Sequence, residues 1–229
     1  MLKKIIATTL VATALMFSGC GETDSVGDSQ LSAQIAIDGG DYAAAISALE
    51  AKAASQRTDD DNLLLASAYM GKAGFSLTDI IIDIQASTST TASTDNLTAF
   101  KDSVIGGGVS STQLADIETA ITYYEQIDGI TTLAPSLATA ADYGVDDTKL
   151  KLGLAYIIKF MIVLNETSNP PTAADLTALS GIANDAFNFI LRAAPTDLKS
   201  NVQDVKNDVD TDFNGTISDS EMQALLDRI

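Results

Sequence analysis

The sequence TKLKLGLAYIIKFMIVLN, residues 148–165, is the segment around which the other helices of this chain are expected to pack. Apolar side chains lie on nearly every side of the helix that it forms, and such a helix has to be covered all round. Lys151 and Lys159 interrupt the apolar run and argue against a membrane span. We therefore expect this helix at the centre of a bundle.

The remainder of the chain carries helical signals with few interruptions. Hydrophobic residues make up 46% of the sequence, and only four prolines break it. Asp41 and Thr172 stand where helix N-caps are expected. No stretch shows the alternation of a strand, so the sequence predicts an all-α protein. Apart from the central segment, helices are expected at residues 29–37, 42–55, 62–74, 97–105, 111–127 and 173–194.

A second informative segment is DTDFNGTISDSE, residues 210–221. A hard divalent cation takes six to eight oxygen ligands, and short oxygen-bearing side chains recur here at alternate positions. Gly215 at the sixth position supplies a sharp turn. Stripes of apolar residues at helical spacing flank the segment on both sides. The oxygen-bearing residues at positions 1, 3, 5, 9 and 12 are Asp210, Asp212, Asn214, Ser218 and Glu221.

This segment and its flanks, residues 196–229, resemble an EF-hand, a helix–loop–helix calcium site. The resemblance implies that calcium is bound by those five side chains and by the backbone carbonyl of Thr216. EF-hands normally occur in pairs, and no second loop is found. A single loop is expected to bind weakly, with a Kd of about 10⁻⁴ to 10⁻³ M, which favours a structural clasp over a sensor. The alternative is an acidic surface turn without metal.

The N-terminus has the features of an export signal. Lys3 and Lys4 precede the apolar residues 5–17, a run too short to span a bilayer comfortably. The ending Phe17-Ser18-Gly19-Cys20 resembles the lipobox of bacterial lipoproteins, although Phe17 stands where Leu is usual.

The lipobox resemblance implies that residues 1–19 are removed and that Cys20 carries the lipid. Acyl chains such as palmitate would then anchor the protein to a membrane. Gly21 after the cysteine implies the outer membrane of a Gram-negative cell, with the protein facing the periplasm. The alternative is an ordinary signal peptide. The predicted division is a signal peptide (1–19), a tether (20–30), a helical domain (31–195) and the EF-hand motif (196–229).

Parts of the helical domain resemble tetratricopeptide repeats. Leu65-Ala66-x-x-Tyr69 and Leu152-Gly153-x-x-Tyr156 match the first helix of that repeat, and residues 40–49 resemble the second. The two first-helix matches lie 87 residues apart, which is not a multiple of the 34-residue repeat. The resemblance implies a solenoid of helical hairpins that binds a protein on its concave face. An irregular helical bundle is the alternative.

Composition excludes several classes of function. The net charge of −18, which becomes −20 if Lys3 and Lys4 leave with the signal, does not suit nucleic-acid binding. The chain has no His, which removes the commonest general base, and no nucleophile or phosphate-loop motif. We therefore expect a non-enzymatic, lipid-anchored scaffold that binds an unidentified envelope protein. The alternatives are a calcium-dependent docking element similar to one dockerin repeat, or an accessory component of an envelope transport complex.

Overall fold

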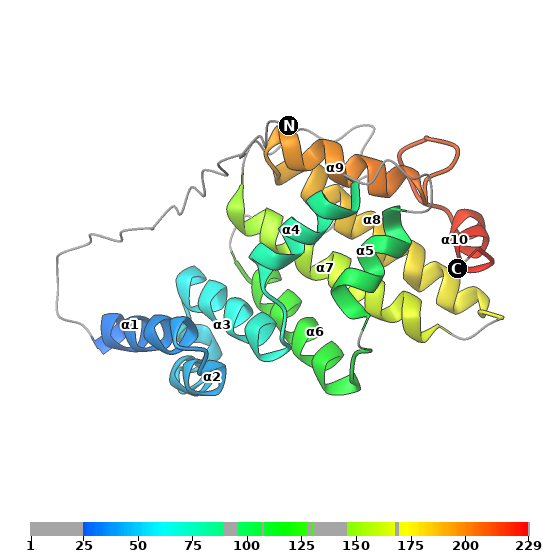
Figure 1. The fold of residues 1–229 in the computed structure, drawn as a ribbon. Coiled ribbons are helices and arrows are strands. Elements are labelled where there is room, and N and C mark those ends of the chain that lie inside the picture. Colours follow the sequence, from blue (N-terminus) through cyan, green and yellow to red (C-terminus); the bar gives the residue numbers. More distant parts are fainter. Residues whose placement is uncertain are drawn as a thin grey trace, which may run out of the picture.

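The computed structural model describes residues 25–88, 96–106, 108–127, 130, 146–167 and 170–228, and within these ranges the chain is all-helical, with no strand (Figure 1). This confirms the predicted fold class. The predicted signal peptide, Cys20 and the first part of the predicted tether lie outside the described residues. The elements are α1 (Ser25–Asp38), α2 (Tyr42–Glu50), the short 3-10 helix η1 (Ala54–Gln56), α3 (Asp59–Lys72), α4 (Leu77–Thr88), α5 (Asn96–Ile105), α6 (Ser111–Glu125), α7 (Asp147–Glu166), α8 (Ala173–Ala193), α9 (Thr196–Asn207) and α10 (Asp219–Leu226).

Helix α7, the predicted central segment, lies in the middle of the bundle between α6, α8 and the α4–α5 pair (Figure 1). Its side chains are buried on every side from Leu150 to Leu164, apart from Lys151, Lys159 and Val163. Gly153 allows α8 to approach, because a Cβ at that position would lie 2.6 Å from Cγ1 of Ile190. The prediction of a central helix is confirmed.

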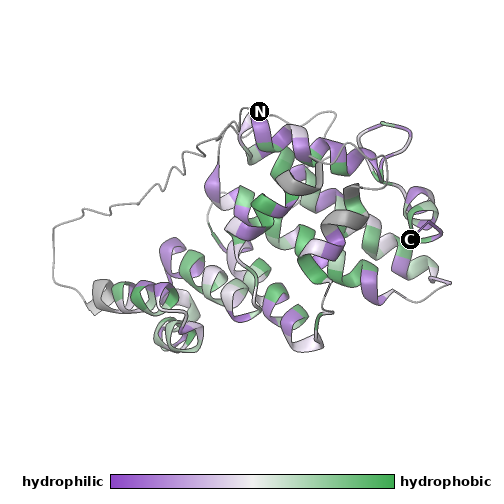
Figure 2. Cartoon of the chain, viewed as in Figure 1, coloured by the Kyte–Doolittle hydropathy of each residue, from purple (hydrophilic) through white to green (hydrophobic). Residues whose placement is uncertain are grey.

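Helix α7 belongs to a row of neighbours in which each helix contacts the next, in the order α1, α2, α3, α6, α7 and α8. The α4–α5 pair leaves this row and packs against α7 and α9, so α3 and α6 become neighbours although two helices separate them in sequence. Apolar residues concentrate between the helices and polar residues on the outside (Figure 2). The two segments similar to the first repeat helix lie on α3 and α7, with α6 between them.

Local capping explains where several helices begin. The Asp41 carboxylate accepts a hydrogen bond from the N–H of Ala44, and the Thr172 hydroxyl accepts one from the N–H of Asp175, so both predicted caps are confirmed. Thr58 caps α3 in a reciprocal arrangement with Asp61. Each cap satisfies backbone donors that the first turn of a helix leaves without partners.

Helices α1 and α2 show the largest differences from the sequence prediction, of four or five residues at one end, and the bounds of α3 and α6 differ by two or three residues. Helix α1 begins at Ser25 rather than at residue 29, so the last residues of the predicted tether are helical. The side chain of Gln30 holds this end by donating to Thr58 Oγ1 at 3.1 Å and to Asp61 Oδ1 at 3.0 Å. Helix α2 ends at Glu50 rather than at residue 55, and Lys52 beyond it turns back to bind Asp61 at 2.7 Å.

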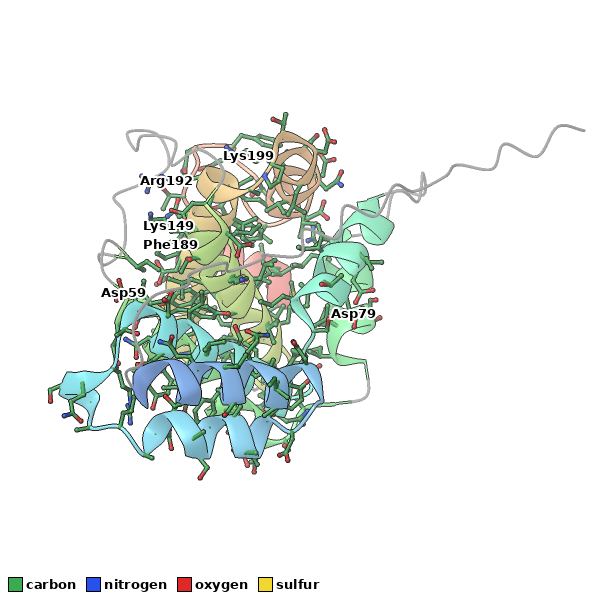
Figure 3. The ribbon with its side chains drawn as sticks, turned by 90° about the vertical axis from the view of Figure 1, so that its left-hand side faces the viewer. Asp59, Asp79, Lys149, Phe189, Arg192 and Lys199 are labelled. Atoms are coloured by element: carbon green, nitrogen blue, oxygen red, sulfur yellow. The ribbon has the colours of Figure 1, made fainter. Side chains whose placement is uncertain are left out.

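Aromatic contacts join the helices of the row. The rings of Tyr69 on α3 and Tyr123 on α6 stack at 5.8 Å, and both hydroxyls donate to Oε1 of Glu50. Tyr156 on α7 stacks at 6.1 Å on Phe189 of α8. Figure 3 labels Phe189 along the α7–α8 pair. Among the described helices, none combines the length and the apolar content that a bilayer span requires.

Candidate metal site in the C-terminal loop

The segment between α9 and α10 folds into a tight loop. Two of its residues adopt a left-handed backbone, Phe213 with φ of 55° and Gly215 with φ of 91°. Glycine adopts such angles without strain, whereas a bulky side chain does so rarely. These two turns reverse the chain within a few residues and bring both of its ends together.

Asp210 lies at the start of the loop and is almost completely buried, with 1% of its surface exposed. Its Oδ2 accepts the N–H of Gly215 at 3.0 Å and the ammonium of Lys206. Its Oδ1 is buried and has no hydrogen-bond partner among the described residues. Because a buried carboxylate oxygen without a partner is costly, this oxygen is suited to a ligand.

Three carboxylates meet at the loop. Asp210, Asp212 and Glu221 each offer an oxygen, and these oxygens lie within 4.8 Å of one another. Glu221 comes from the first turn of α10 and folds back over the start of the loop, where Oε1 accepts the N–H of Thr211 at 2.7 Å. Three like charges this close repel one another, and a bound cation would remove that repulsion.

Hydrogen bonds hold Glu221 in its charged form. Burial raises its pKa, but donors on Ser218, Asp212 and Thr211 more than offset burial, so the pKa lies below its usual value. The donors include the N–H groups of Ser218 at 2.9 Å and Asp212 at 3.2 Å. These donors therefore favour the charged form of Glu221.

The other predicted side-chain ligands lie in the same loop. Asn214 is exposed, donates to Asp212 Oδ2 at 2.7 Å and accepts the N–H of Thr216 at 2.8 Å. Ser218 caps α10 and bonds Glu221 Oε2 at 2.9 Å. The loop thus brings the side chains of Asp210, Asp212 and Glu221 together, and hydrogen bonds place Asn214 and Ser218 beside them.

The loop is fastened to helix α8. The side-chain amide of Asn184 donates to the carbonyl of Ile217 and accepts its N–H, both at 2.8 Å. One and two turns earlier on α8, Ser180 and Thr177 donate to the carboxylate of Asp219 at 2.6 and 2.8 Å. Those two hydrogen bonds hold the pKa of Asp219 below its usual value. The loop is therefore a part of the bundle rather than an appended arm.

Sequence reasoning missed three residues that shape this site: Lys206, Asn184 and Phe213. Lys206 lies beside the buried apolar residues of α9, and only the fold shows that its own side chain is buried as well. Asn184 lies 33 residues before Ile217 and had no sequence signal. Phe213 fills a left-handed position that usually favours Gly or Asn.

A second group of acidic residues, 59–61, forms the first turn of α3, where Asp61 takes part in the helix cap. Asp61 is fully buried and is bound by Lys52, by Gln30 and by the N–H of Thr58. Burial raises the pKa of Asp61, but these partners lower it below its usual value.

Comparison of the chain with family models, with curated proteins and with solved structures gives no match. The geometry of the loop and its attachment to α8 are therefore the basis for any functional conclusion.

Proposed function

We propose that this chain is a non-catalytic, calcium-binding helical protein in which the ion strengthens the attachment of α9 and α10 to the body of the bundle. One observation carries the proposal. Oδ1 of Asp210 is buried and has no hydrogen-bond partner in the described part of the chain, and it belongs to a set of three carboxylates whose oxygens lie within 4.8 Å. A hard cation, which binds oxygen ligands, would give the buried oxygen a partner and would neutralise charge among the three carboxylates.

The residues present suit calcium. Asp210, Asp212 and Glu221 supply charged oxygens, and neutral oxygens come from three further residues. No His is present in the chain and no Cys in the loop, so the donor set contains only oxygen, as calcium prefers and zinc does not. The neutral oxygens belong to the side chains of Asn214 and Ser218 and to the backbone carbonyl of Thr216.

A structural role follows from the attachment of the loop to α8. Asn184, Ser180 and Thr177 tie the loop and α10 to the bundle, so an ion that orders the loop stabilises more than the loop itself. At a free calcium concentration of ten times the Kd, mass action adds about 1.4 kcal/mol to the stability of the folded state.

Equilibrium calcium titration by calorimetry tests this proposal. We expect one ion bound per chain and at least about a tenfold weaker Kd for Asp212→Asn, which removes one charged ligand. Asp60→Asn, an exposed acid on α3 with the same change of charge, is the matched control. Absence of binding by the wild type, or equal Kd values for wild type and Asp212→Asn, would show that the loop is not a calcium site.

We further propose that Cys20 attaches the chain to a membrane and that the helical body binds another envelope protein. The signal-like sequence before Cys20 and the hairpin-like neighbours α1–α2 and α7–α8 support these proposals. Incorporation of a fatty-acid analogue, lost in Cys20→Ser, tests the anchor.

The binding role is tested by recovering a cross-linked partner from membranes. The surface variant for this test replaces Leu31 and Ile35 of α1 by Asp. Both side chains are more than half exposed and lie one turn apart.

A calcium-dependent docking element is the second candidate, and Phe213 favours it. Its side chain is 70% exposed at the turn of the loop, where a partner would contact it. A pull-down with and without chelator distinguishes the candidates. Loss of the partner in chelator and in Phe213→Asn, with retention in the Leu31 and Ile35 variant, would favour docking through the loop.

A further inference from the structure

Lys206 is the one buried lysine among the described residues, and it stands beside the proposed calcium site. It lies four residues after Val202 and three before Val209, on the face of α9 where the neighbouring positions are apolar and buried. Only 1% of its surface is exposed. Lysine side chains normally carry their ammonium out to water, and a fully buried lysine is rare unless it is paired. An aliphatic residue would fit this position without that cost.

The pairing of Lys206 leaves one oxygen of Asp210 free. Its ammonium donates to Oδ2 of Asp210, the same oxygen that accepts the N–H of Gly215. Oδ1 on the other side of the carboxylate has no hydrogen-bond partner among the residues that the structure describes. Lys206 therefore does not block Oδ1, the oxygen that a metal ion would use. Its positive charge nevertheless lies close to that ion, because both would bind the same carboxylate.

The charges of the site then match those of a divalent ion. Asp210, Asp212 and Glu221 carry three negative charges, and Lys206 reduces the sum to minus two. The affinity of an oxygen site for calcium depends on its charge count, and charges in a buried setting act on one another strongly.

We propose that Lys206 sets the metal affinity of this loop. Its ammonium offsets the charge of one carboxylate and so weakens the binding of cations, and it gives the buried Asp210 a partner of opposite charge when the loop is without metal. The inference rests on the proposed function, since it assigns the residue that tunes the same site. As a consequence, the loop binds metal weakly and stays folded when the ion is absent.

The test compares wild type and Lys206→Met by calorimetric titration with Ca²⁺ and, separately, with Tb³⁺. Removing one positive charge should tighten calcium binding by at least about tenfold. Since the energy of a charge pair scales with the charge of the ion, the logarithm of the gain for Tb³⁺ should be about one and a half times that for Ca²⁺. The metal-free variant should also melt at a lower temperature than metal-free wild type, because Asp210 loses its charged partner and keeps only the N–H of Gly215.

Lys151→Met is the matched control, because Lys151 also pairs with an Asp four residues away, at 2.6 Å, but on the more exposed start of α7. It changes the net charge equally and should leave both affinities within about twofold. Unchanged or weaker calcium binding by Lys206→Met, or equal gains for the two ions, would overturn the role of Lys206. If only the variant binds calcium, the proposed function of the wild type is wrong but the role of Lys206 stands. If neither binds, both are wrong.

Discussion

The side-chain amide of Asn184 forms two hydrogen bonds with the backbone of Ile217, one to the carbonyl and one from the N–H, both at 2.8 Å. This is the pair of bonds that a neighbouring extended strand would form. Here helix α8 supplies both bonds from one side chain. The attachment explains how a single loop is held in place within the described part of the chain.

We expect Asn184→Ala to lower the free energy of unfolding by about 1–3 kcal/mol, because it leaves the polar backbone groups of the buried Ile217 without partners. Asn201→Ala, a half-buried residue on α9, is the control and should change stability by less than about 0.5 kcal/mol. Urea denaturation measures both. A loss for Asn184→Ala no larger than that of the control would mean that α8 does not hold the loop.

The left-handed backbone at Phe213 predicts that replacing this residue will stabilise the protein. This backbone strains a bulky residue, and the side chain of Phe213 is 70% exposed. Phe213→Asn should therefore raise the free energy of unfolding of the metal-free protein by about 1 kcal/mol. Gly215→Ala, at φ of 91°, should lower it by a similar amount. Thermal melting in chelator checks the opposite signs, and a lower melting temperature for Phe213→Asn would refute the assigned strain.

Close packing at Gly153 predicts a strong effect of one added methyl group. A Cβ there would lie 2.6 Å from Cγ1 of Ile190 and 2.9 Å from Cβ of Phe189. Gly153→Ala should cost about 1–3 kcal/mol of stability despite the better helix propensity of alanine. Gly181→Ala on α8 has open space around the new Cβ and should gain up to about 1 kcal/mol. Equal effects of the two substitutions would disprove the close approach of α7 and α8.

The raised pKa of Asp185 predicts that the stability of the protein depends on pH. Burial raises this pKa to about 6, the charge of Glu125 adds to the increase, and Lys159 opposes it. Because the pKa is raised on folding, the folded state binds more protons, and the Asp185 contribution to stability falls as the pH rises from about 4 to about 6. Asp185→Asn should remove this contribution and gain on the order of 1 kcal/mol at pH 7, a value reduced for solvent screening at a half-buried group.

The measurement for Asp185 is the difference in unfolding free energy between Asp185→Asn and wild type at several pH values. It should grow from pH 4 to pH 6 and then remain constant. A difference that is constant from pH 4 to pH 7 would contradict the raised pKa. Asp175→Asn, on the same helix, provides a contrast, because hydrogen bonds from Thr172 lower the pKa of Asp175.

Features that depend on nearby residues were predictable from the sequence. The apolar character of residues 148–165 placed α7 at the centre, and the caps at Asp41 and Thr172 were recognised because a cap acts within one helical turn. The acidic residues of the loop that come together were likewise named from their spacing.

Features that depend on distant residues were not predictable. Nothing local indicates that α3 packs on α6 across two intervening helices, or that Asn184 meets Ile217. Lys206 is close to Asp210 in sequence, yet its burial depends on how α9 packs against the rest of the bundle. A lysine at that spacing on an isolated helix would be read as a surface ion pair.

The most direct test of the account is the melting temperature of the wild type and of Glu221→Gln, each measured in excess calcium and in excess chelator. At ten times the Kd, calcium should raise the melting temperature of the wild type by roughly 3–6 °C, which follows from about 1.4 kcal/mol for a chain of this length. Glu221→Gln, which lacks one of the three carboxylates, should show little or no rise. Equal melting temperatures of the wild type with calcium and with chelator, or the same rise in Glu221→Gln, would contradict the account.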